Sequence, residues 1–137
     1  MDQVTKIVIK GSSSDKAAPE NAYTDTLTIQ ASGVTYVFAP VNETEQQSKL
    51  QWSYKSNTPT YAKAFDTIGR QMRYLATRVT TGKYADITPL TVTISIENSK
   101  SVKFTVYSHD IPAELIENIR KLVPRIERFP KSLKQFV

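Results

Sequence analysis

Five short stretches of this chain alternate apolar with polar residues, and this alternation constrains the fold more than any other feature. Successive side chains of a β-strand point to opposite faces, so each stretch predicts a strand with one buried face and one exposed face. Residues 4–10 predict a sixth strand, although consecutive Ile7, Val8 and Ile9 are typical of a strand covered on both faces. The alternating apolar positions are Leu27/Ile29, Val34/Tyr36/Phe38, Leu50/Trp52/Tyr54, Val92/Ile94/Ile96 and Val102/Phe104/Val106.

Turn residues separate these strands. Ser32-Gly33 predicts a two-residue hairpin turn, because glycine readily adopts the positive φ that such turns require. Asn98-Ser99-Lys100 predicts a second hairpin with a slightly longer loop. The polar stretches 11–21 and 40–49 predict surface loops.

Two segments have helical spacing instead. Thr58-Pro59 predicts the start of the first helix, with threonine as the N-cap and proline in the first helical position. Gly69 within this helix predicts a close approach to a strand or another helix. The second helix is predicted to begin at Asp110-Ile111-Pro112 and to end before Pro124. The apolar faces are Tyr61, Phe65, Ile68, Met72, Leu75 and Val79 in the first helix, and Leu115, Ile116, Ile119, Leu122 and Val123 in the second.

The order of elements predicts an α+β fold in two layers. We expect a mostly antiparallel sheet of about six strands, in the order ββββαββα, with two helices packed on one face. The other face would be exposed and rich in threonine. Threonine suits exposed strand positions, and such a face is also a flat docking surface. The threonines expected there are Thr24, Thr26, Thr28, Thr91, Thr93 and Thr105.

The length of 137 residues is that of one domain. We predict a single α+β domain at residues 1–124, followed by a basic amphipathic segment at 125–137 that packs back on the domain or extends from it. No stretch approaches the roughly 20 apolar residues of a membrane span, and the first residues lack a signal-peptide pattern. A cytoplasmic location is therefore expected, although removal of a signal peptide would leave the same sequence.

The sequence shows no catalytic or cofactor-binding pattern. His109 is the one histidine, and Asp110 follows it directly. Side chains of adjacent residues rarely point at one another in the way that a catalytic triad requires. Asp110 is therefore interpreted as the N-cap of the second helix. The chain has no cysteine, and its carboxylates lack metal-loop spacing. Its four glycines are too dispersed for a phosphate loop. We expect no metal and no cofactor.

Positive charge is concentrated near the C-terminus. Six basic residues and one acid, Glu127, give residues 118–137 the whole net charge of +5. The cations either complement the end of the second helix or attract an acidic protein or a phosphate backbone; a membrane surface is the least favoured partner. These candidate binding residues are Arg120, Lys121, Arg125, Arg128, Lys131 and Lys134.

The leading hypothesis is a non-enzymatic interaction module that binds a protein partner through the exposed sheet face, the basic segment or both. An acidic protein surface is the expected partner. The principal alternative is a nucleic-acid-binding protein that uses the basic segment. An enzyme with a site near His109 is the lesser alternative.

Overall fold

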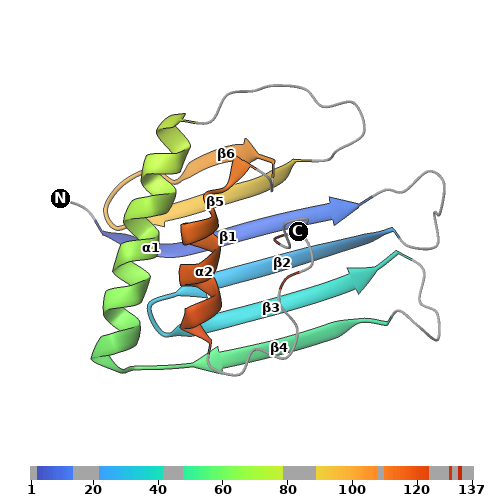
Figure 1. Ribbon diagram of the computed structural model, residues 1–137, viewed down its shortest axis with the longest axis horizontal. Helices are drawn as coiled ribbons and strands as arrows, with labels where there is room; N and C mark the ends of the chain where they lie inside the picture. Colours follow the sequence, from blue (N-terminus) through green and yellow to red (C-terminus); the bar gives the residue numbers. More distant parts are fainter. Residues whose placement is uncertain are drawn as a thin grey trace.

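The computed structural model describes residues 3–13, 22–41, 48–78, 89–107 and 110–123, together with Pro130 and Leu133. It confirms the predicted α+β class and the order ββββαββα (Figure 1). The elements are β1 (Val4–Ser13), β2 (Tyr23–Gln30), β3 (Gly33–Pro40), β4 (Leu50–Lys55), α1 (Pro59–Arg78), β5 (Leu90–Ile96), β6 (Val102–Val106) and α2 (Ala113–Leu122).

The strands form one antiparallel sheet in the order β4-β3-β2-β1-β5-β6. The first four strands form a meander, and α1 then crosses the sheet from the β4 edge toward β5 and β6 (Figure 1). This crossover allows β5 to pair with β1, so the first strand of the chain becomes a central strand of the sheet. The β5–β6 hairpin predicted around Asn98 is confirmed, and Asn98 has a positive φ of 57°.

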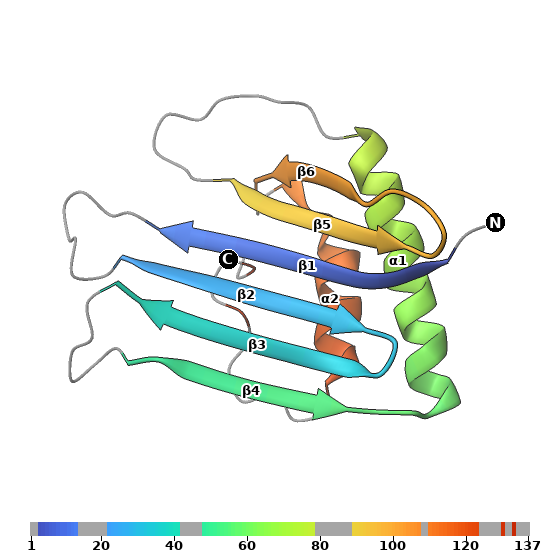
Figure 2. The ribbon, with the colours of Figure 1, turned by 180° about the vertical axis from the view of Figure 1, so that it is seen from behind.

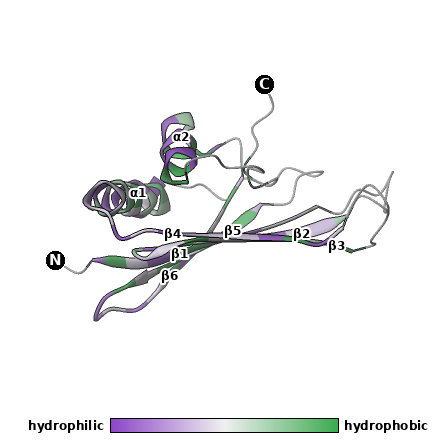
Figure 3. Cartoon of the chain, turned by 90° about the horizontal axis from the view of Figure 1, so that it is seen from below, coloured by the Kyte–Doolittle hydropathy of each residue, from purple (hydrophilic) through white to green (hydrophobic). Residues whose placement is uncertain are grey.

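Both helices lie on the same face of the sheet (Figure 3). The core forms between this face and the helices, because alternate strand residues and the apolar helix stripes meet there. The predicted apolar helix residues that the structure describes are buried, although Val123 follows the end of α2. Gly69 of α1 is buried as well, and Val79 lies outside the described residues. Buried residues at the centre of the core include Ile7, Ile9, Leu27, Ile29, Val92 and Ile94 from the strands and Ile68, Met72, Leu115 and Ile119 from the helices.

The start of α1 and its packing follow the prediction. The Thr58 hydroxyl accepts a hydrogen bond of 3.2 Å from the backbone N–H of Tyr61, which satisfies one of the unpaired donors at the helix end. Gly69 brings α1 close to β1, because a Cβ added at this position would lie 3.1 Å from Cβ of Val4. Glycine therefore sets the distance between the helix and the strand.

The predicted start of α2 is wrong. Pro112, not Asp110, occupies the N-cap position, and no side chain there caps the helix. Proline disfavours helical φ and ψ in the residue before it, so Ile111 cannot join the helix and the start moves to Ala113. Asp110 instead lies in a turn, where its N–H donates to the Tyr107 carbonyl over 2.9 Å.

Three local predictions also need correction. The turn between β2 and β3 consists of Ala31 and Ser32, whereas Gly33 begins β3 with φ of 156°. A Cβ at Gly33 would overlap the Tyr54 carbonyl oxygen, so the close approach of β4 requires glycine there. Strand β1 continues to Ser13, into the stretch predicted as a loop. The half-buried Val8 lies on the helix-free face, shielded by paired Thr28 and Thr93 rather than by a second layer.

Candidate functional site

The candidate site is the face of the sheet that neither α1 nor α2 covers, which we call the open face (Figure 2). Directly paired residues of antiparallel strands share a face, so the strand registers define its members. The six predicted threonines all lie on it and are exposed or half-buried. The hydroxyl residues of the open face are Ser12, Thr24, Thr26, Thr28, Thr35, Ser53, Thr91, Thr93, Ser95 and Thr105.

Four lysines project from the open face among these hydroxyls. Lys6 and Lys10 lie on β1. They point to the open face because they alternate in phase with Val8, whereas Ile7 and Ile9 are buried on the helix side. Lys55 pairs with Gly33 at the β4 edge, and Lys103 pairs with Thr93 at the β6 edge. Lys55 and Lys103 are far from the two β1 lysines in the sequence, and only the sheet brings all four onto one surface. The sequence does not indicate this group, because its members do not form a continuous charged segment.

Adjacent lysines on this surface lie roughly 10–15 Å apart, as the strand spacing and the rise per residue dictate. Such spacing is too wide for one small anion to contact all four side chains. Among the described residues at outward strand positions, none is acidic and none is aromatic. The open face is therefore a dispersed positive surface with many hydroxyl hydrogen-bonding groups.

The basic residues predicted as a site divide into two groups. Arg120 and Lys121 are exposed on the last turn of α2, where they complement the helix dipole. Arg120 Nε also forms an ion pair of 3.3 Å with Glu117. Arg125, Arg128, Lys131 and Lys134 lie outside the described residues.

Two residues of the C-terminal segment are described, and both are buried. Leu133 has an exposed fraction of 1% and belongs to the hydrophobic core, and Pro130 is also buried. The Leu133 N–H donates to the Pro130 carbonyl over 3.1 Å. An experiment that removes this segment would therefore remove a core residue together with the basic charge.

The catalytic alternative gains no geometric support from the described residues. His109 and Ser108 lie outside them, and Asp110 is exposed beside that gap. No group of three or more His, Asp or Glu side chains suitable for a metal occurs in the part of the chain that the structure describes. In the same part, no helix is long and apolar enough to cross a membrane.

Comparison with known proteins gives no relative from which a function could be transferred. No family model matches the chain, no curated protein matches it, and no solved structure matches it. The function of the chain must therefore be inferred from the geometry and charge of its surface.

Proposed function

We propose that this chain is a non-enzymatic interaction module that binds an acidic protein surface through its open face. The observation that carries the proposal is the position of Lys6, Lys10, Lys55 and Lys103 on one sheet face, with no carboxylate among the described strand residues that point outward between them. Opposite charge on a partner would speed encounter and select its orientation. A second copy of the same face would present lysines to lysines, so an acidic partner fits better than a homodimer.

The size of the open face suits a macromolecule. Six strands of 5 to 10 residues, about seven on average, at about 4.8 Å spacing give a surface of roughly 24 by 24 Å. This area approaches the roughly 800 Å² that each partner contributes to a typical interface. Threonine and serine hydroxyls across this area both donate and accept hydrogen bonds, so they can pair with carboxylates and backbone groups of a partner.

Nucleic acid is the alternative partner, because lysines also attract phosphates. Single-stranded nucleic acid is commonly held by stacking its bases on aromatic side chains, and the described outward positions offer none. The nucleic-acid alternative therefore relies on the basic residues at the C-terminal end. Of these, Arg120 already has an acidic neighbour in Glu117.

The test compares charge variants that differ only in location. An open-face variant carries Lys6→Gln, Lys10→Gln, Lys55→Gln and Lys103→Gln. A matched control removes the same charge from exposed helix and turn positions, with Lys63→Gln, Arg73→Gln, Lys100→Gln and Lys121→Gln. Binding to a poly-glutamate peptide is measured by fluorescence anisotropy at low and moderate salt. We expect the open-face variant to bind about tenfold more weakly and the control to change less than about threefold.

A third variant tests the nucleic-acid alternative without removing Leu133. It carries Arg125→Gln, Arg128→Gln, Lys131→Gln and Lys134→Gln, and its binding to mixed-sequence single-stranded DNA is measured alongside poly-glutamate. Tighter binding to DNA that this variant abolishes would replace our proposal with the alternative. Equal weakening of poly-glutamate binding by the open-face and control variants would show that only net charge matters.

A further inference from the structure

A pocket of about 800 Å³ lies on the helix side of the sheet, opposite the open face. It is bounded by the C-terminal half of α1, the end of β6 and the beginning of α2. Its apolar lining includes Leu75, Val106 and Leu115. This volume lies within the range of pockets that hold drug-sized molecules or short peptides.

One wall of the pocket is basic. Arg70, Tyr74 and Arg78 occur at intervals of four residues on α1, so they follow one another along the same face of the helix. Arg78 is held by Tyr74, because its Nη1 donates to the tyrosine hydroxyl over 3.0 Å and its guanidinium carbon lies 5.5 Å from the ring centroid. Tyr74 is itself 63% exposed, which is unusual for so large a side chain and leaves its ring accessible to a ligand.

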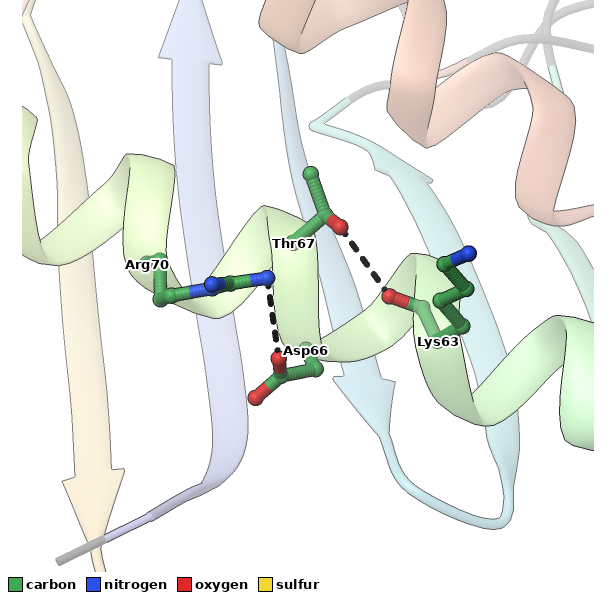
Figure 4. A network of polar contacts seen from close by, with 4 residues as sticks. All are labelled: Lys63, Asp66, Thr67 and Arg70. Carbon is green, nitrogen blue, oxygen red and sulfur yellow. Dashed lines mark hydrogen bonds and ion pairs between the residues drawn. The ribbon is translucent and has the colours of Figure 1, made fainter. Parts of the chain in front are cut away.

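The second arginine of this wall is also oriented. Arg70 forms an ion pair of 3.1 Å with Asp66, which lies on the same helix rather than across the pocket (Figure 4). Arginine has five N–H donors, so one such pair leaves donors for a ligand. Gln71 adds a neutral donor at the pocket lining, because its Oε1 accepts a hydrogen bond of 3.0 Å from Asn118 and this fixes the amide orientation.

The opposite wall is acidic. Asp110 precedes α2 and Glu114 lies in its first turn, and both exposed residues line the pocket. The carboxylates of Asp110 and Glu114 would repel a ligand that carries only negative charge, and Arg70 and Arg78 would repel a ligand that carries only positive charge. The two walls complement a molecule that carries one group of each sign on an apolar body.

We propose that this pocket binds a zwitterionic, peptide-like ligand, with its anionic group at Arg70 and Arg78 and its cationic group at Asp110 and Glu114. Its apolar body would contact Leu75 and Leu115. A free dipeptide with charged ends and a longer peptide with acidic and basic side chains share this chemistry. The inference is independent of the proposed function, because the pocket and the open face lie on opposite sides of the sheet.

The test uses three probes in NMR titrations of the backbone amides. The free dipeptide Leu-Leu carries both charges at its ends, whereas the capped tetrapeptide acetyl-Lys-Leu-Leu-Glu-amide carries them on side chains. Acetyl-Leu-Leu-amide carries neither charge. We expect one charged probe to saturate with a dissociation constant below about 1 mM, to shift amides near Tyr74 and Glu114, and to bind at least tenfold more tightly than the uncharged probe. The charged probe that binds more tightly identifies the source.

Matched variants locate the binding. Arg78→Gln and Glu114→Gln should each weaken binding by about tenfold, because each removes a charge-assisted hydrogen bond. Arg73→Gln and Glu117→Gln make the same chemical changes on the same helices at exposed positions that do not line the pocket. Absence of saturation with both charged probes at about 10 mM, equally tight binding of the uncharged probe, or equal effects of the control variants would each overturn the inference.

Discussion

The Tyr36 hydroxyl donates a hydrogen bond of 2.8 Å to the Asp25 carboxylate, and both side chains are buried on the helix side of the sheet. Asp25 is 4% exposed and is the one buried charged residue among those that the structure describes. Burial of a charged group is costly unless hydrogen bonds compensate for lost water. The Tyr36 hydroxyl supplies part of that compensation.

Tyr36→Phe should therefore lower the free energy of unfolding by about 1–3 kcal/mol, because the carboxylate loses a buried donor. Urea unfolding followed by circular dichroism measures the change. Tyr54→Phe serves as the control, since it removes a hydroxyl from the half-buried edge strand β4. A Tyr36→Phe cost no larger than that of Tyr54→Phe would show that the hydrogen bond contributes little.

Gly69 and Val4 set the distance between α1 and β1. Gly69→Val should destabilise the protein by about 1–3 kcal/mol, since the new side chain would overlap Val4. Val4→Ala should recover part of this loss in the double variant, although it is destabilising by itself. A double-mutant cycle based on urea unfolding measures the coupling. Additive effects of the two changes would contradict the proposed contact.

Ionisation of Tyr61 should make stability depend on alkaline pH. Burial, reinforced by the nearby Tyr54, raises the pKa of Tyr61 from 10.0 to about 12, and its hydroxyl donates to the Gln30 carbonyl. The unfolded chain therefore ionises at lower pH than the folded protein does. The stability contribution is fully present below about pH 10 and is lost as the pH rises to about 12. In urea unfolding across this interval, Tyr61→Phe should show a shallower decline, and an unchanged decline would exclude Tyr61 as the cause.

Leu133 should anchor the C-terminal segment to the core. Leu133→Ala is expected to cost about 2–5 kcal/mol, as for other fully buried leucines. Thermal unfolding measures the loss, with Lys134→Ala as a neighbouring control. Equal melting temperatures for Leu133→Ala and the unaltered protein would mean that this leucine does not contribute to the core in solution.

The local elements could be predicted from the sequence because each follows from residues close together in the chain. Alternation located the strands, and Thr58-Pro59 located the start of α1. The same alternation places Asp25 in phase with Leu27 and Ile29, so the burial of its carboxylate also follows from the sequence. The N-cap of α2 was misplaced because proline at position 112 restricts the residue before it.

The surfaces were harder to predict because they join residues that are distant in the sequence. Lys6 and Lys103 share the open face only because β1 pairs with β5 and β5 pairs with β6. No local pattern specifies that pairing. The pocket likewise combines Arg78 of α1 with Glu114 of α2, and their proximity depends on how both helices pack on the sheet. The C-terminal charge was visible because its residues are contiguous.

Methyl NMR during a titration with poly-glutamate tests the open-face proposal most directly. Val8, Val37, Thr28 and Thr93 place methyl groups on the open face, whereas Leu115 and Ile119 place theirs in the core beneath α2. We predict saturable shifts of the open-face methyl signals that weaken with added salt, with little change at Leu115 and Ile119. Shifts confined to α2 and the C-terminal segment, with the open-face methyl signals unchanged, would contradict the proposal.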